Sequence, residues 1–433
     1  MSEGEHGMSD AGHGTWRLTD AQRAFRERLR EVVLEEIRPR VREIDERCDY
    51  PHDIHRILAR EGLLGLAVPR EDGGKGETEV SFCAFVEELA KVSGTISLMA
   101  AYVKLVSLPI VLAGTAEQKR RWLPPLIQGE IYGSYALTEP SVGSDPAALE
   151  TTAERRGDVW VLNGQKRFIG NAGLSEVYVV FARTGDPGSK GITAFIVDGR
   201  SPGISVEPLR TMGMPGWQLG APRFEDVEVP AENVLGRVGD GFKIAMMTFD
   251  RSRPGVAAQG VGLAQGSIDL ALDYALRRHA FGRPILDHQG IQFKLASMEA
   301  EVAAARALTF QAATFVDEMN PRMTKVSSMA KLIATDTAMR VTTEAVQVLG
   351  GNGYLKDYPA ERMMRDAKVL QIYEGSNEIQ RLVIARHMLR QAMERDPVWP
   401  ECMPGAPGVE SGEEVPAPEE QAGAPHAGVG AVA

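Results

Sequence analysis

The spacing of apolar positions divides the chain into three blocks. Over residues 19–129 apolar side chains recur every three or four positions, which is the period of helices that bury one face. Over residues 132–238 they form short runs rich in β-branched and aromatic residues, as at 177–181 and 192–197, which predicts strands. The helical period returns over residues 241–391. The pattern predicts an α+β fold with an all-α domain, a middle β-barrel or β-sandwich domain and a C-terminal helical domain.

Local signals refine this division. Thr19 is the predicted N-cap of the first helix. Asn163 and Gly164 follow the strand-like run 160–162 and predict a tight hairpin, and the charged run 250–254 predicts a helix start. In the last block five residues are spaced by four and three, which predicts the seam of a four-helix bundle: Ile291, Leu295, Met298, Val302 and Ala305.

Both ends of the chain differ in composition from the middle. Residues 397–433 contain seven prolines and six glutamates, residues 1–16 contain three acidic residues, and neither segment has a Lys or Arg. Such segments bury too little apolar surface to offset the entropy lost on ordering. We therefore expect disordered tails at 1–16 and 397–433, and domains at 17–131, 132–238 and 239–396.

Charge and cysteine content narrow the functional classes. The 433-residue chain carries a formal charge of -11, but the acidic tails leave only -2 for residues 17–396. This balance argues against general nucleic-acid binding, whereas local arginines are compatible with phosphorylated ligands. Cys48, Cys83 and Cys402 form neither a disulfide framework nor a metal-ligand pattern, so we expect a reducing compartment and no metal site.

We also expect a cytoplasmic protein without a membrane span. The first 16 residues lack the basic and apolar features of a secretory signal or transit peptide. The most apolar stretch, 96–116, is interrupted by Lys104 and Pro109. We interpret this stretch as a buried helix pair.

The loop at 135–145 carries candidate ligand contacts. Pro140 and Gly143 favour a compact turn, where the hydroxyls of Thr138 and Ser144 and free backbone N–H groups suit an acceptor-rich ligand. A simple capped turn would explain the same residues.

Glu374 is the candidate for acid–base chemistry. It follows the largely apolar run 370–373 and precedes Gly375, and burial of such a carboxylate raises its pKa toward the range of a general base. Ser376 or Asn377 would then cap the last helix. The alternative is a solvated loop residue ahead of a helix start.

Two further segments have structural explanations when each is taken alone. The glycines at 350–353 suit the C-terminus of a helix. The cationic and amide side chains at 277–289 suit either a bound phosphate or the dipole of a helix end.

Together, these motifs resemble those of the acyl-CoA dehydrogenase family, over about residues 19–389. They occur in the family's order: Thr-Glu-Pro-x-x-Gly-Ser-Asp at 138–145, Phe-Glu-Asp-Val-x-Val-Pro at 224–230, Gly-Gly-Asn-Gly at 350–353 and Tyr-Glu-Gly at 373–375. The resemblance implies the three-domain fold of that family, bound FAD, and oxidation of an acyl thioester to its 2-enoyl form.

The resemblance also implies roles for individual residues. Glu374 matches the usual catalytic base; some relatives use a residue of the first bundle helix, but the matching residue here is Arg251, which cannot serve. Positions that match contacts to FAD, some of them from a neighbouring subunit, are Tyr135, Leu137, Thr138, Ser144, Phe168, Gly170, Arg278, Phe281, Gln289, Gln347, Gly350, Gly351, Ser376 and Glu378. Positions that match contacts to the acyl-CoA are Ser144, Asp250, Arg253, Tyr373 and Gly375.

Three features depart from the family pattern. Gly170 lacks a hydroxyl that many relatives place beside the flavin, which leaves reactivity toward oxygen open. Pro215 and Trp217 add bulk and remove an expected cation, so we carry over no ligand contacts for their loop. Lys104 lies among residues expected to line the acyl pocket, where it pairs with a carboxylated acyl tail or, more simply, extends to the surface.

The implied partners are an acyl-CoA or acyl-carrier-protein thioester, an electron-transfer flavoprotein as electron acceptor, and further copies of the chain in a homotetramer built as a dimer of dimers. Two alternatives share the fold: an oxidase that uses oxygen directly and a dehydrogenase of carrier-bound thioesters. A flavin-dependent hydroxylase is disfavoured by Glu374. A helical scaffold without FAD is the last alternative.

Overall fold

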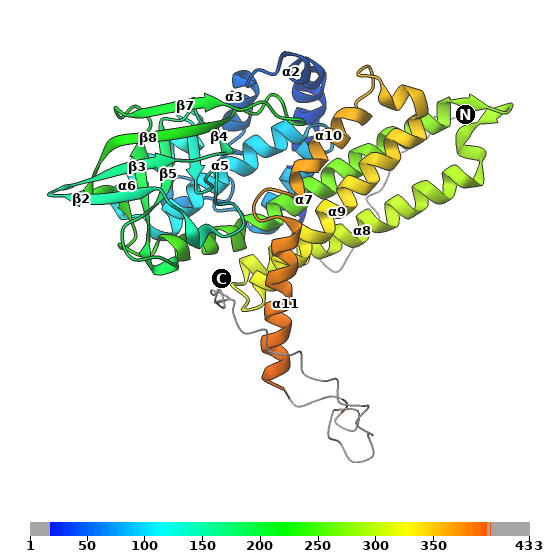
Figure 1. The fold of residues 1–433 in the computed structure, drawn as a ribbon. Coiled ribbons are helices and arrows are strands. Elements are labelled where there is room, and N and C mark those ends of the chain that lie inside the picture. Colours follow the sequence, from blue (N-terminus) through cyan, green and yellow to red (C-terminus); the bar gives the residue numbers. More distant parts are fainter. Residues whose placement is uncertain (1–17, 396–398, 400–433) are drawn as a thin grey trace, which may run out of the picture.

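The computed structural model describes residues 18–395 and 399 (Figure 1). The predicted tails therefore lie outside the described residues, apart from Trp399. Within the described part, helices come first, strands follow, and helices return, in the order predicted from the apolar spacing.

The N-terminal block is helical. Thr19 caps its first helix as predicted, because its hydroxyl accepts from the backbone N–H of Gln22 at 3.2 Å while Gln22 Oε1 accepts from the Thr19 N–H at 2.9 Å. A π-helical turn at Val33–Ile37 and a 3₁₀ turn at Arg38–Arg40 follow it. The α-helices are α1 (Asp20–Val32), α2 (Val41–Arg47), α3 (His52–Arg60), α4 (Glu79–Ala90), α5 (Gly94–Ala113) and α6 (Ala116–Ile127).

The most apolar stretch is one continuous helix, not the predicted pair. Pro109 lies inside α5 without ending it, and the next helix begins only at Ala116. By length and composition α5 could cross a membrane, but 78% of its apolar window is buried inside the protein. Core burial therefore accounts for its composition, as expected.

The middle block forms a nine-stranded sheet in the order β4-β8-β3-β2-β5-β6-β9, with β1 paired to β5 and β7 paired to β8. The predicted strands at 177–181 and 192–197 pair with each other as antiparallel neighbours. The strands are β1 (Gly133–Ala136), β2 (Thr152–Arg156), β3 (Val159–Gln165), β4 (Ile169–Gly170), β5 (Val177–Arg183), β6 (Ile192–Asp198), β7 (Ile204–Pro208), β8 (Leu219–Pro230) and β9 (Val234–Leu235).

The hairpin predicted at Asn163 and Gly164 is wrong. Both residues lie inside β3, where the pairing with β8 shifts register, and the Asn163 side chain bonds Asp226 on β8. The turn instead lies at the other end of β3, beside Gly157, whose φ of 64° is in the left-handed region. Asn-Gly here lies at an irregularity in the β3–β8 pairing, where Asn163 has a cross-strand partner.

The C-terminal block returns to helices. The helix start predicted at 250–254 is wrong: α7 begins at Gly241 and includes Pro254. The seam predicted from Ile291 to Ala305 lies on α8, with Leu295, Met298 and Val302 buried. The elements are α7 (Gly241–Arg277), β10 (His279–Ala280), β11 (Arg283–Pro284), α8 (Gln289–Asp317), α9 (Met323–Leu349), α10 (Ala360–Leu370) and α11 (Asn377–Met393).

Short 3₁₀ turns link several of these elements. They lie at Arg70–Asp72, Pro146–Ala148, Ser189–Gly191, Ala231–Asn233, Ile285–Asp287 and Gly350–Tyr354.

The largest hydrophobic core connects the three blocks. It joins the N-terminal helices to one face of the sheet and to α7, while α7, α8 and α9 pack around a second core. The other face of the sheet has its own cluster. Figure 1 shows α5 between the sheet and α7, so side chains from all three blocks meet there.

Candidate active site

Glu374 lies in the loop between α10 and α11, against the first half of α7. Its side chain is partly buried, and its φ of 53° places a non-glycine residue in the left-handed region. The hydroxyl of Ser252 on α7 donates a hydrogen bond to Glu374 Oε2. Backbone strain of this kind is held by its surroundings and is typical of functional sites.

Burial and neighbouring groups act on the pKa of Glu374 in opposite directions. Burial raises the pKa of Glu374 above its ordinary value, and the Ser252 hydrogen bond and the charges of Arg253, Lys104 and Lys331 oppose that rise. A carboxylate whose pKa is raised is a stronger general base than an ordinary glutamate.

The α7 residue that faces Glu374 is not the one predicted. Arg251 donates to the backbone oxygen of Met247 at 3.1 Å and contacts Met319, so it does not occupy the position opposite the loop. Ser252 occupies that position. Since serine carries no carboxylate, the conclusion that α7 supplies no alternative base is unchanged.

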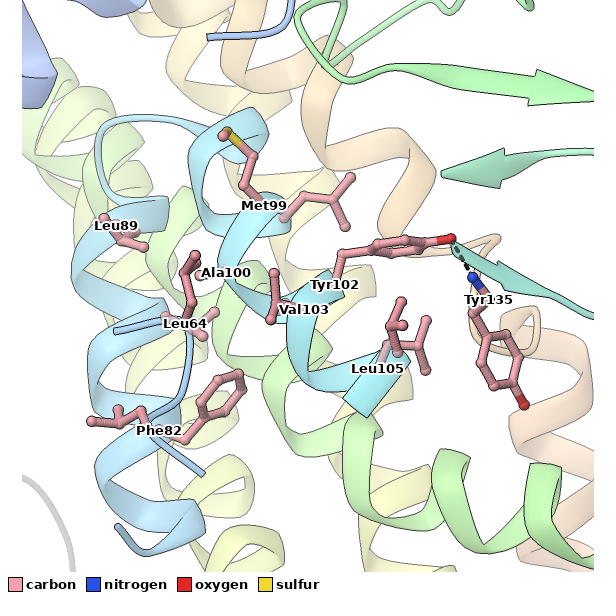
Figure 2. Packing of buried hydrophobic residues seen from close by; sticks show 14 of the residues in the cluster. Leu64, Phe82, Leu89, Met99, Ala100, Tyr102, Val103, Leu105 and Tyr135 are labelled. Atoms are coloured by element: carbon pink, nitrogen blue, oxygen red, sulfur yellow. Dashed lines mark hydrogen bonds between the residues drawn. The ribbon is translucent and has the colours of Figure 1, made fainter. Parts of the chain in front are cut away.

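Two tyrosines and Gly170 form a wall beside this loop. The Tyr102 hydroxyl donates to the Gly170 backbone oxygen at 3.1 Å. It also accepts from the Tyr135 N–H at 3.1 Å (Figure 2). Burial raises the pKa of Tyr102 and of Tyr135, and the charge of Glu374 adds to both shifts. The base and the two rings therefore share one buried region.

Two of the departures from the family pattern meet in this wall. A Cβ atom on Gly170 would lie 2.7 Å from Trp217 Cζ2 and 2.7 Å from Tyr102 Cζ. The rings of Trp217 and Tyr102 pack edge to face with centroids 4.9 Å apart. Position 170 is therefore occupied by glycine because aromatic rings fill the space of a side chain.

Arg253 and Asp250 lie on the same stretch of α7 as Ser252. Arg253 is buried and donates to Asp250 Oδ1 at 3.2 Å and Ser328 Oγ at 3.3 Å. The second oxygen of Asp250 accepts from Thr324 at 2.7 Å. The two predicted substrate contacts are thus brought together, beside Gly375.

A polar chain that the sequence did not reveal extends behind Tyr373. The Tyr373 hydroxyl donates to Gln259 Oε1 at 2.6 Å, and Gln259 Nε2 donates to Ser97 Oγ at 3.1 Å. Gln259 and Ser97 are buried. Small and polar residues on otherwise apolar helix faces were the only sequence signal for them.

Lys104 does not extend to the surface, so that interpretation is wrong. The residue is 4% exposed, forms an ion pair with Glu79, and donates to the Arg251 backbone oxygen at 2.9 Å. Its Nζ lies 4.3 Å from the centre of the Phe82 ring. Because Glu79 already neutralises the cation, a carboxylated acyl tail is not needed to explain its burial.

A buried ion pair supports the 137–144 loop. Lys166 Nζ donates to Glu139 Oε1 at 2.7 Å and to the Leu137 backbone oxygen at 3.1 Å. Glu139 is therefore structural, whereas Thr138 is partly exposed and Ser144 exposed. Phe168, across the loop, is 58% exposed with a φ of 58°.

The remaining predicted FAD contacts do not meet Glu374 within one chain. Arg278 follows the end of α7, 26 residues after Ser252, which corresponds to about 39 Å along a helix. These residues, called the distal group below, are all exposed, Phe281 to 95%. The group comprises Arg278, Phe281, Gln289, Gln347, Gly350 and Gly351.

Ser376 and Glu378 lie at the start of α11. Ser376, one of the two predicted capping residues, occupies the N-cap position, although its side chain makes no capping hydrogen bond. Glu378 is exposed. Both are next to the Glu374 loop in sequence and remain accessible to a ligand.

The residues present fit a large ligand with polar edges such as FAD. In the described part of the chain, the Tyr135 hydroxyl and the Arg253 Nε are buried yet have no hydrogen-bond partner. A Cβ on Gly143, Gly350 or Gly351 would meet no atom within 4 Å. Buried polar groups are normally paired. Of the nine such unpaired atoms in the described residues, these two belong to side chains that lie near Glu374, where a ligand would pair with them. Among residues 18–395, no group of three or more His, Cys, Asp or Glu residues is arranged to hold a metal ion.

Comparison with known proteins identifies the same three blocks. The acyl-CoA dehydrogenase N-terminal, middle and C-terminal domains match residues 19–130, 134–227 and 239–389. A short-chain specific acyl-CoA dehydrogenase of Clostridium acetobutylicum is 41% identical over 378 residues, 87% of this chain and 100% of that protein.

Solved structures agree with these matches. The butyryl-CoA dehydrogenase of Megasphaera elsdenii has a TM-score of 0.84 and 41% identity, over 87% of this chain and 100% of that chain. A chain in a structure concerning the electron transferring flavoprotein of Acidaminococcus fermentans has a TM-score of 0.84 and 42% identity, over 87% and 99%. With all three domains matched in order, this chain belongs to the acyl-CoA dehydrogenase family and is an FAD-dependent acyl-CoA dehydrogenase.

Proposed function

We propose that Glu374 is the catalytic base, which removes the C2 proton of a saturated acyl-CoA while hydride leaves C3, so that the product is the trans-2-enoyl thioester. The observation that carries this proposal is the position of Glu374 in a buried region beside Tyr102, Tyr135 and Gly170, with Ser252 bonded to its carboxylate. FAD, when bound, supplies the hydride acceptor.

The chain's own residues orient and protect the reaction. Ser252 directs one oxygen of Glu374, which leaves the other oxygen to accept the substrate proton. The backbone N–H of Glu374 polarises the thioester carbonyl, where negative charge develops during proton removal. The buried rings of Tyr102 and Trp217 exclude water from the wall beside the Glu374 loop.

We assign the ligand contacts in two groups. Tyr135, Leu137, Thr138, Ser144, Phe168, Gly170, Ser376 and Glu378 hold FAD from the chain that carries Glu374, while the distal group serves a neighbouring copy. The acyl-CoA contacts Ser144, Asp250, Arg253, Tyr373 and Gly375. The span of about 39 Å between Ser252 and Arg278 supports this division.

The relatives support the proposed substrate and electron acceptor. The short-chain and butyryl-CoA enzymes favour a short acyl-CoA as substrate. The similarity to a chain in the Acidaminococcus structure favours an electron-transfer flavoprotein, rather than oxygen, as electron acceptor. We place the protein in the cytoplasm as a homotetramer.

Replacing the base tests the proposal. Glu374→Gln preserves size but cannot take a proton, so we expect FAD absorbance to be retained while oxidation of butyryl-CoA falls at least about 10³-fold. Turnover can be followed with an artificial electron acceptor, and FAD content by the visible spectrum.

Glu394→Gln is the matched control, because Glu394 is exposed at the far end of α11. It should behave like the parent enzyme. Turnover by Glu374→Gln within tenfold of the parent would remove Glu374 from the mechanism.

A further inference from the structure

A buried lysine contacts the loop that carries Glu374. Lys331, on α9, has no exposed surface, and lysine is rarely buried unless its ammonium group is paired. Its Nζ donates to the Gly375 backbone oxygen at 2.9 Å and to Asn377 Oδ1 at 2.9 Å. Both acceptors lie within three residues of the proposed base.

The loop needs such support because its backbone conformation is unfavourable. Glu374 and Gly375 have φ values of 53° and 88°, in the region that side chains disfavour. A second donor, Nε2 of Gln380, reaches the backbone oxygens of Gly375 at 2.8 Å and Glu374 at 3.3 Å. Lys331 from α9 and Gln380 from α11 therefore hold the carbonyl groups of the strained turn.

Asn377 connects this support to the rest of the domain. Its Nδ2 donates to Asp336 Oδ1 at 2.7 Å and to Thr335 Oγ1 at 2.9 Å, both on α9. Asp336 also accepts from Gln371, at the end of α10, at 2.7 Å. The lysine thus belongs to a network that joins three helices around the base loop.

The charge of Lys331 also acts on Glu374. Burial lowers the pKa of Lys331 to about 7, so its positive charge is present below neutrality and is lost as the pH rises through about 7. While charged, it favours the carboxylate form of Glu374. The charged groups that face it are Glu374 in the loop, Arg253 on α7, Asp336 on α9 and Glu378 on α11.

We propose that Lys331 is the positioning residue of the base: its ammonium group holds the Glu374–Gly375 turn and favours ionised Glu374. This rests on the proposed role of Glu374. Lys331 does not contact the reacting atoms in this scheme; it acts through the loop.

The test uses the FAD-loaded enzyme and the pH dependence of kcat/KM for butyryl-CoA. Lys331→Met removes the donors and the charge, so we expect kcat to fall about 10- to 100-fold and the acid limb to move up by about one pH unit. Lys331→Arg keeps the charge and should leave the acid limb near its original position. Lys325→Met is the control, because this lysine on the same helix contacts only Gln391 among the partners found for it.

A flavin-containing Lys331→Met enzyme with parental kcat and an unmoved acid limb would overturn the proposal. If that variant does not fold, Gln380→Leu removes the second donor without changing charge. It should lower kcat at least about fivefold, and parental kcat would contradict the idea that these donors hold the base. Glu374→Gln tests the assignment of the base separately, because this variant leaves Lys331 in place.

Discussion

Position 170 lies between two aromatic rings, and this contact explains a residue that looked anomalous in the sequence. The glycine approaches Trp217 and Tyr102 so closely that even a methyl group would overlap both rings. The ring of Trp217 therefore requires glycine at 170, although the two residues are 47 positions apart. The Tyr102 hydroxyl donates to the Gly170 backbone oxygen and so holds the Tyr102 ring against the glycine.

Gly170→Ala should destabilise the protein by about 1–3 kcal/mol, because the added carbon overpacks a closed region. Trp217→Leu in the same chain should recover part of the loss, since it removes one of the two obstructing rings. Urea unfolding of the single and double variants measures both effects.

Gly290→Ala is the control, since a Cβ there meets no atom within 4 Å. It should not lower stability. Parental stability in Gly170→Ala would show that the rings move aside readily and that the close approach has no energetic consequence.

At the scale of elements, a hydrogen bond joins α10 to the loop that contains Trp217. Asp366 on α10 accepts from the Met214 N–H at 2.6 Å and is 1% exposed. Burial raises the pKa of Asp366 to about 7, against the ordinary value of 3.8, while the nearby arginines Arg362 and Arg365 oppose the rise. This single side chain therefore couples the loop position to pH.

The sign of the coupling follows from linkage. Asp366 binds its proton more tightly in the folded protein, so its contribution to stability is full below about pH 4 and is lost as the pH rises through about 7. The unfolding free energy of the parent relative to Asp366→Asn should therefore decrease between pH 5 and 8, by up to about 3 kcal/mol. Denaturant unfolding across this range measures the difference, and a pH-independent difference would exclude the effect.

At the scale of the whole molecule, exposed apolar side chains indicate further contacts. Figure 1 shows α11 extending away from the rest of the protein. Leu382, Met388, Leu389 and Met393 on this helix are between 50% and 88% exposed, and Phe281 beyond α7 is 95% exposed. Large exposed apolar groups of this kind mark interaction surfaces, which supports the proposed homo-oligomer.

We expect the enzyme to sediment as an oligomer at micromolar concentration. Leu389→Asp should shift the distribution to smaller species, because a carboxylate at a buried contact is costly. Phe281→Ser should lower FAD content, since we assign Phe281 to the cofactor of a neighbouring copy. Sedimentation of the parent as a monomer would contradict the assembly.

Local information was enough to predict the order of helices and strands, the Thr19 cap and the seam on α8. Each of these depends on residues close together in the chain, whose spacing directly reflects which face is buried. Glu374 was predicted as the candidate base from the apolar run and the glycine that flank it, together with its match to a family motif. The Asn163-Gly164 hairpin failed because its cross-strand partner, Asp226, lies 63 residues away.

The surroundings of Glu374 depend on contacts between distant parts of the chain. Ser252 meets the carboxylate across 122 residues, and Lys331 reaches the Gly375 oxygen across 44. Lys104 pairs with Glu79 between two adjacent helices, which no local pattern distinguishes from exposure at the surface. Spacing along the chain thus predicted the elements, and a motif pointed to Glu374 as the candidate base. The packing of α5, α7 and α9 around the loop of Glu374 selected the neighbours of this side chain, because burial and charge depend on neighbours in space.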